Sequence, residues 1–243
     1  MQLLPFITTL IMLVFTISVF RRYAARRGMH FLFWGIGLAM FGIASFAEAY
    51  LIMAWSQWLF YFWFLFGAIL NPAYIGQGTL FLLARKRWVS VLAVILVVLS
   101  VLTAIMMLRT MPLLNTSAYS AGVPISQQYK TIMPPIAEGG AVRLMPILFG
   151  TYGSVTLIGG ALYSIWLFWR KRILPNRVIG NFLIAAGALS VAFASVLTGF
   201  GYGQFLFAGE LIAAILMYWG FILAGRPAVQ TEAVAQPSPV GSD

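Results

Sequence analysis

The sequence predicts an all-α integral membrane protein built as a bundle of seven transmembrane helices, and three observations lead to this prediction. The chain of 243 residues is 62% hydrophobic and 8% charged, whereas soluble domains are about 45–50% apolar. Its apolar residues form seven runs of the length that crosses a bilayer, about 20 residues each. Basic residues gather in the connections on one side of these runs. The remaining length leaves no room for a separate soluble domain.

The predicted transmembrane domain covers residues 1–224. Its spans are residues 3–20, 31–54, 59–83, 88–108, 144–169, 178–198 and 204–223. The one long connection, residues 109–143, exceeds ordinary loops of about 4–6 residues, and it is either a lid over the outer face of the bundle or a disordered segment. Residues 225–243 contain too few apolar residues to fold, so we expect a disordered cytoplasmic tail.

The net charge of +10 is distributed unequally between the two sides of the predicted bundle. Of 15 basic residues, 12 lie on one side: Arg21, Arg22, Arg26, Arg27, Arg85, Lys86, Arg87, Arg170, Lys171, Arg172, Arg177 and Arg226. Arg109, Lys130 and Arg143 lie on the other. The positive-inside rule therefore predicts an outside N-terminus and a cytoplasmic C-terminus, in a multi-pass protein of the plasma (inner) membrane. We expect the charge to attract anionic headgroups of the lipid bilayer, not nucleic acid.

Small residues give the second span a face that can approach other helices closely. Gly37, Ala44 and Glu48 lie on one side of a helix with 3.6 residues per turn. Small residues in membranes mark helix–helix contacts, so Glu48 is expected to point into the bundle and not toward lipid. The first span begins with Pro5, which is tolerated in a first helical turn.

The third span changes character along its length. Its first half is aromatic, which is typical of a belt near the lipid headgroups. Asn71-Pro72 follows, with Gly76 and Gly78 soon after, and proline removes a helical hydrogen bond. This pattern predicts a kink or local unwinding. Such a break either lines a cavity within the bundle or is an ordinary proline kink whose freed groups bond to neighbouring helices.

The later spans suggest how the bundle is organised. The fourth is almost purely Val, Leu and Ile, which favours a peripheral helix facing lipid. A short glycine-rich turn makes the sixth and seventh antiparallel neighbours. The spans divide into three, one and three, and residues 34–45 and 184–195 share identities at Gly37/Gly187, Ala44/Ala194 and Ser45/Ser195. These identities indicate either an internal repeat or coincidence among abundant small residues.

Two spans carry an acid, and the two acids lie at matching depth. Glu48 and Glu210 each lie about six residues from the outer end of their span, or ~9 Å deep at 1.5 Å per residue. Intramembrane acids indicate a functional site, and two that approach each other would share a proton. The predicted ligand-binding residues are Glu48, Glu210, Tyr61, Tyr152, Asn71 and Gln77. In the alternative, each acid is protonated, bonds to hydroxyls or pairs with Arg109 or Arg143, and the amides form interhelical hydrogen bonds.

Several kinds of chemistry are excluded by composition. The chain has no cysteine and one histidine, His30, so a thiolate or multi-histidine metal site cannot form. Asp243 is the sole aspartate, and the three lysines fall outside the predicted spans, which excludes a Schiff base within the bundle. We therefore predict no enzymatic activity, no metal and no cofactor.

The sequence leaves two classes of function open. The first hypothesis is a carrier that binds or translocates a small solute, cationic or proton-coupled, through an outer site formed by Glu48 and Glu210. Acids with nearby aromatic rings suit a cation. The alternative is a membrane sensor without transport, or an accessory subunit that docks to partner membrane proteins. Either version can form a homo- or hetero-oligomer.

Overall fold

The computed structural model describes residues 4–84, 86–171, 175–199 and 204–225, and every described element is a helix. The long elements are α1 (Leu4–Arg26), α2 (Met29–Met53), α3 (Gln57–Phe62), the π-helix η1 (Trp63–Leu70), α4 (Asn71–Leu83), α5 (Arg87–Thr110), α7 (Met145–Lys171), α8 (Pro175–Gly199) and α9 (Gln204–Ala224). Between α5 and α7 lie η2 (Met111–Leu113), η3 (Thr116–Ala118), α6 (Ile125–Ile132), η4 (Ile136–Glu138) and η5 (Ala141–Leu144). The predicted tail lies outside the described residues, apart from Gly225.

Six helices of the described part are long and apolar enough to cross a membrane. They are Leu4–Arg26, Met29–Met53, Gln57–Leu83, Arg87–Leu113, Ala141–Gly160 and Phe205–Ala224. These helices confirm the prediction of an all-helical chain with several apolar helices of membrane-spanning length. The sixth predicted span, residues 178–198, falls within α8, whose described apolar stretch is the shorter Phe182–Val191.

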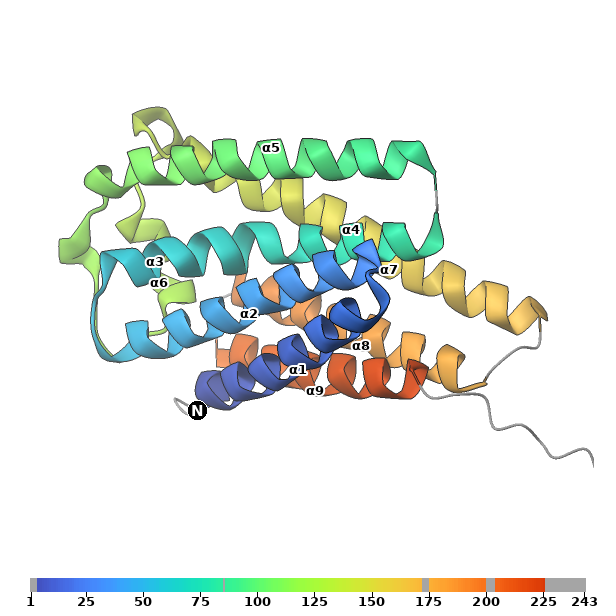
Figure 1. The fold of residues 1–243 in the computed structure, drawn as a ribbon. Coiled ribbons are helices and arrows are strands. Elements are labelled where there is room, and N and C mark those ends of the chain that lie inside the picture. The colour runs from blue at the N-terminus through green and yellow to red at the C-terminus, as the bar shows by residue number, and fades with distance from the viewer. Residues whose placement is uncertain (1–3, 85, 172–174, 200–203, 226–243) are drawn as a thin grey trace, which may run out of the picture.

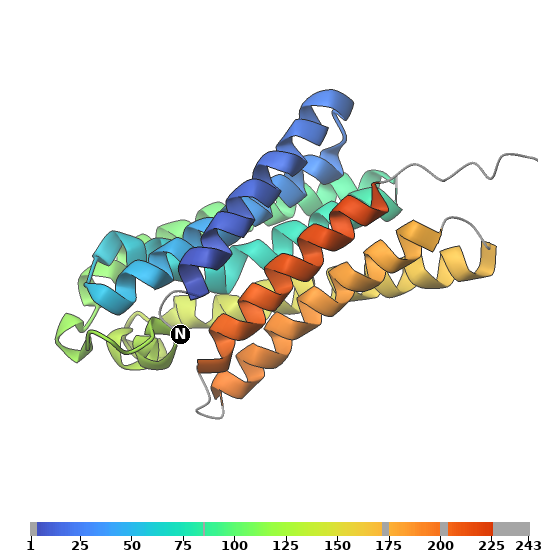
Figure 2. The same ribbon diagram turned by 90° about the horizontal axis from the view of Figure 1, so that it is seen from below.

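Six long elements pack side by side as a closed ring. Each contacts the next in the order α1, α2, α4, α7, α8 and α9, and α9 contacts α1 again. Figures 1 and 2 show the long helices running roughly along one axis, with α9 between α1 and α8. Helix α5 lies outside this ring, against α4 and η1. Its outer side chains, including Val91, Val94 and Val101, are more than half exposed, as its Val/Leu/Ile composition predicts.

Aromatic and basic side chains join α1 to α9 where the ring closes. The ring centroids of Phe15 and Tyr218 lie 5.2 Å apart. Near the other end of α1, the guanidinium of Arg22 lies 3.9 Å from the centroid of Phe221 and its Nη1 donates to the Phe221 carbonyl at 3.4 Å. The same carbonyl also accepts the N–H of Gly225 at 3.2 Å, so Arg22 adds a second bond to it and joins α1 to the end of α9.

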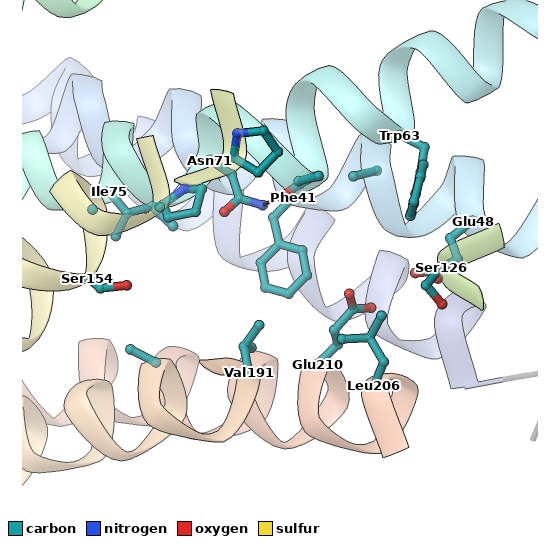
Figure 3. A pocket seen from close by; sticks show the side chains of 18 of the residues that line it. Phe41, Glu48, Trp63, Asn71, Ile75, Ser126, Ser154, Val191, Leu206 and Glu210 are labelled. Carbon is teal, nitrogen blue, oxygen red and sulfur yellow. Dashed lines mark hydrogen bonds between the residues drawn. The ribbon is translucent and has the colours of Figure 1, made fainter. Parts of the chain in front are cut away.

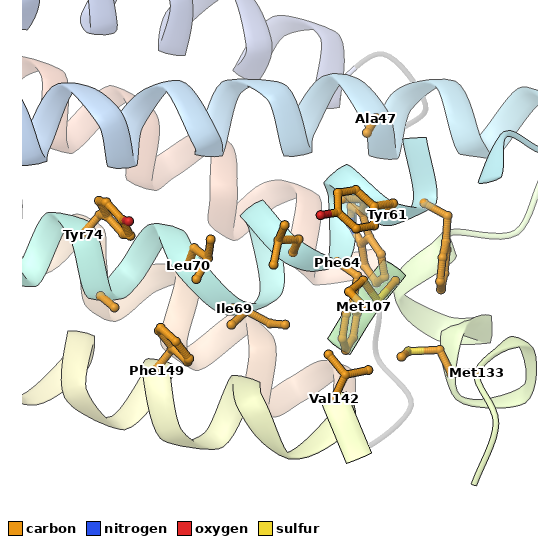
Figure 4. Close-up of a cluster of buried hydrophobic side chains, with 14 of the residues drawn as sticks. Ala47, Tyr61, Phe64, Ile69, Leu70, Tyr74, Met107, Met133, Val142 and Phe149 are labelled. Carbon is orange, nitrogen blue, oxygen red and sulfur yellow. The ribbon is translucent and has the colours of Figure 1, made fainter. Parts of the chain in front are cut away.

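The aromatic half of the third span packs inward. Phe60, Tyr61, Trp63 and Phe64 are all buried, with at most 7% of their surface exposed. They belong to the hydrophobic cluster of Figure 4, together with Met107 of α5 and residues of the long connection between α5 and α7. The predicted belt at the headgroups is therefore replaced by a core, because the connection between α5 and α7 folds over these rings.

The connection between α5 and α7 is folded, and hydrogen bonds tie it to the end of α2. The hydroxyl of Tyr119 donates to the Leu51 carbonyl at 2.9 Å, and the N–H of Gly122 donates to the Ile52 carbonyl at 2.7 Å. Burial, followed by the nearby Tyr50, raises the pKa of Tyr119, so its hydroxyl remains a donor. The connection thus contains folded elements, and its position as a lid over the outer face stays a prediction.

A π-helix precedes the Asn71-Pro72 pair where the sequence predicts a kink or local unwinding. In this wider helix the N–H of Asn71 bonds to the Phe66 carbonyl. The carbonyl of Gly67 would next receive the N–H of residue 72, which proline lacks. Instead, Nδ2 of Asn71 donates to the Gly67 carbonyl at 3.2 Å. The side chain thus replaces the bond that the proline removes.

We expect the substitution Asn71→Leu to lower the free energy of unfolding by about 1 kcal/mol, a typical cost for a lost bond in a membrane protein. It leaves the Gly67 carbonyl without its donor. The measurement is a denaturation midpoint in detergent micelles. Ser154→Ala is the control, since it removes a hydroxyl from the neighbouring helix α7 without leaving a backbone carbonyl unpaired. Equal midpoints for the two variants would contradict this role of Asn71.

Small residues allow α8 and α9 to pack with their backbones close together. Gly180, Gly187 and Ala194 recur every seven residues on α8. A Cβ at Gly180 or Gly220 would lie within 3 Å of the other residue's carbonyl oxygen. Larger side chains would push these helices apart, so the packing determines where α9 lies in the ring.

Candidate functional site

The helical ring encloses a cavity of about 440 Å³. Its walls come from α2, η1, α4, α6, α7, α8 and α9: Phe41, Ala44, Glu48, Trp63, Phe64, Gly67, Ala68, Asn71, Pro72, Ile75, Ser126, Tyr129, Pro146, Gly150, Gly153, Ser154, Leu157, Ile158, Ala188, Val191, Leu206, Glu210 and Met217. Most of these side chains are apolar. The volume suits a small organic molecule, since ligand pockets commonly measure about 300–1,000 Å³.

Glu48 reaches this cavity because α2 packs closely against the third span. A Cβ at Gly67 would overlap that of Ala44, one turn before Glu48. The Glu48 side chain is only 1% exposed, and its Oε1 has no hydrogen-bond partner in the described part of the chain. Figure 3 shows Ser126 of α6 beside it. The Ser126 hydroxyl is likewise buried without a partner among the described residues.

Glu210 enters the cavity from α9. The preceding residue, Gly209, packs against α8, where the hydroxyl of Ser190 donates to the Gly209 carbonyl at 3.0 Å. This contact turns the next side chain away from α8, and Figure 3 shows Glu210 pointing into the cavity beyond Phe41. Its Oε2 is buried and has no hydrogen-bond partner within the described segments.

The two carboxyl groups dominate the electrostatics of the cavity. They come from two different helices, α2 and α9, and both line the same cavity. No lysine, arginine or histidine is among the described residues that line the walls. Arg143 donates to the Pro134 carbonyl at 3.3 Å, and Arg109 lines a separate cavity of about 240 Å³. The structure therefore places the two arginines of the alternative interpretation elsewhere.

The structure brings together three of the six predicted ligand-binding residues. Glu48, Glu210 and Asn71 line the cavity. Gln77 is fully buried outside it, where its Oε1 accepts a bond from Tyr152 and its Nε2 donates to the Val89 carbonyl at 2.9 Å. These contacts match the interhelical bonding that the sequence offered as the alternative for the amides.

Tyr61 also lies away from the cavity. Its hydroxyl donates to the Ala104 carbonyl of α5 at 3.5 Å. Because α5 stands outside the ring, this bond directs the side chain outward from the centre. Tyr61 thus joins α5 to the third span.

Some wall residues were not predicted from the sequence. Ser126 and Tyr129 belong to α6, within a connection that carries little helical pattern overall. The ring of Tyr129 packs against Trp63 and Phe64 with centroids 5.9 Å apart in both pairs. The seven-residue spacing of Ile125 and Ile132, both fully buried, was the available signal of a short helix with one buried side.

The chain matches no family model, and neither the curated proteins nor the solved structures include a detectable relative. The chemistry of the site is consequently argued from its own residues. Among the described residues, no three of His, Cys, Asp and Glu gather as a metal site would require. An apolar cavity with two acids and aromatic walls can neutralise and enclose a cation.

Proposed function

We propose that this protein is a multi-pass membrane protein that binds a small organic cation inside the ring, with Glu48 and Glu210 as counter-charges. The observation that carries the proposal is the pairing of two acids with an otherwise uncharged cavity wall. Each acid has a buried oxygen without a hydrogen-bond partner in the described chain. A buried charge without a partner is costly, and a bound cation would supply the partner.

The proposed arrangement in the membrane has an outside N-terminus and seven spans, in which α8 is added to the six long apolar helices. The excess of basic residues at one end of the bundle supports this orientation. The ring order also supports a division into α1–α4 and α7–α9 as two triplets, with α5 between them in sequence and outside the ring. An internal repeat would relate the two triplets by a two-fold axis through the cavity.

The test of cation binding is a thermal-shift measurement of the detergent-solubilised full chain with benzyltrimethylammonium. Its neutral carbon analogue, neopentylbenzene, has nearly the same shape. A ligand at 100 times its dissociation constant stabilises the native state by about 2.7 kcal/mol. We expect the cation to raise the melting temperature and the neutral analogue to have little effect.

Variants of the acids make this test specific to the cavity. The double variant Glu48→Gln/Glu210→Gln is expected to lose the cation-dependent shift. Glu138→Gln is the matched control, because Glu138 is an exposed acid of the outer connection, and it should keep the shift. A shift that persists in the double variant, or that is absent in the native chain, would contradict the proposal. Uptake of the cation into liposomes that contain the protein then distinguishes a carrier, which transports the cation, from a sensor, which only binds it.

A further inference from the structure

The cavity presents an electrostatic problem that the proposed function does not by itself solve. Glu48 and Glu210 are the only two acids among its described lining residues, and no basic residue accompanies them there. The remaining groups near them are Ser126, Trp63 and the phenol of Tyr129. None of these carries a compensating positive charge.

The cost of leaving either carboxyl ionised is large. Moving an isolated carboxylate into a low-dielectric interior costs several kcal/mol even after relaxation. Oε1 of Glu48 and Oε2 of Glu210 accept no bond from the described residues, and the groups beside the Glu48 carboxyl, Ser126 and Trp63, carry no positive charge. Two ionised carboxylates would in addition repel each other. A neutral cavity requires both groups to hold a proton.

A cation that enters this neutral cavity must also leave the cavity with a net charge near zero. It needs an ionised carboxylate as its counter-charge, and the net charge within the walls should stay near zero. We propose, on the basis of the cation site described above, that each bound monovalent cation displaces one proton from the Glu48–Glu210 pair. One O–H bond breaks, the proton passes to the solvent, and the carboxylate oxygen then faces the cation.

This exchange gives the protein proton-coupled binding. The proton and the organic cation compete for the same two carboxyl groups, so either one is released by an excess of the other. The titratable groups that face the pair are Glu48 and Glu210 themselves, from α2 and α9, and Tyr129 from α6. The described residues of α4, α7 and α8 contribute no acid or base to the cavity wall.

The test counts released protons by isothermal titration calorimetry with benzyltrimethylammonium and the full chain in detergent. The titration is repeated at one pH in buffers with different ionisation enthalpies, and the slope of heat against ionisation enthalpy gives the number of protons. We expect about one proton per bound cation. The dissociation constant should also fall about tenfold for each unit rise in pH while the pair remains protonated.

The variants and outcomes separate this inference from the proposed function. The Glu138→Gln variant should release one proton per bound cation, as the native chain does. The double variant Glu48→Gln/Glu210→Gln should give no binding heat. Saturable binding with no proton released, and with a dissociation constant independent of pH, would overturn the exchange but leave the cation site standing. The absence of binding in the native chain would instead overturn the proposed function.

Discussion

Gly153→Ala is expected to lower the free energy of unfolding by about 3 kcal/mol, the upper part of the range for overpacking. A Cβ at Gly153 of α7 would lie closer than 3.0 Å to backbone atoms of Pro72 and Ala73. The third span cannot easily move away, because α2 packs on its other side at Gly37, where a Cβ would meet Ile75 and the Asn71 carbonyl. The strain therefore has no flexible side chain to absorb it.

The same helix provides the control for this prediction. Gly159 also lies in α7, but a Cβ there would meet no atom within 4 Å. Alanine favours a helix over glycine by roughly 0.5–1 kcal/mol, so Gly159→Ala should be neutral or slightly stabilising. The measurement is the denaturation midpoint of each variant, Gly153→Ala and Gly159→Ala, in detergent. Similar midpoints would show that α4 and α7 do not meet at Gly153 as the structure has them.

Tyr152→Phe is expected to reduce stability by about 1.5 kcal/mol, near the maximum measured for a single interhelical bond in a membrane protein. The tyrosine hydroxyl is the donor to Oε1 of Gln77, a side chain with no exposed surface. Removing the donor leaves that oxygen buried without its partner, which costs more than the bond itself gains. The measurement is the denaturation midpoint of each variant with and without benzyltrimethylammonium.

A double-mutant cycle distinguishes structural bonding from ligand binding at these residues. In Tyr152→Phe/Gln77→Leu both polar groups are gone. Gln77→Leu should therefore lower the free energy of unfolding by less in the Tyr152→Phe background than in the native chain. The affinity for the cation should be unchanged throughout, because neither residue lines the cavity. Loss of cation affinity with normal stability would show that the two residues contact the ligand after all.

The inward direction of Glu48 could be read from the sequence because it depends on local features. Glu48 shares a helical face with small residues, and such faces meet other helices in a membrane. For Glu210 the sequence indicated only its depth, and its direction follows from the contact of Gly209 with α8. The structure brings both carboxyls to one cavity. The contributions of Ser126 and Tyr129 could not be read, because an amphipathic turn in an irregular connection does not indicate which surface it covers.

Sequence patterns alone determined the elements of this protein, and tertiary packing decided their neighbours. Apolar runs of membrane-spanning length and helical periodicity are properties of each segment, so most helices could be placed and the peripheral character of α5 predicted. The partners of Gln77 and Tyr152, the inward turn of the aromatic half of the third span and the folding of α6 over the ring all depend on long-range contacts. Those contacts follow from how glycine-lined surfaces such as those at Gly67 and Gly153 fit together, which a single sequence does not express.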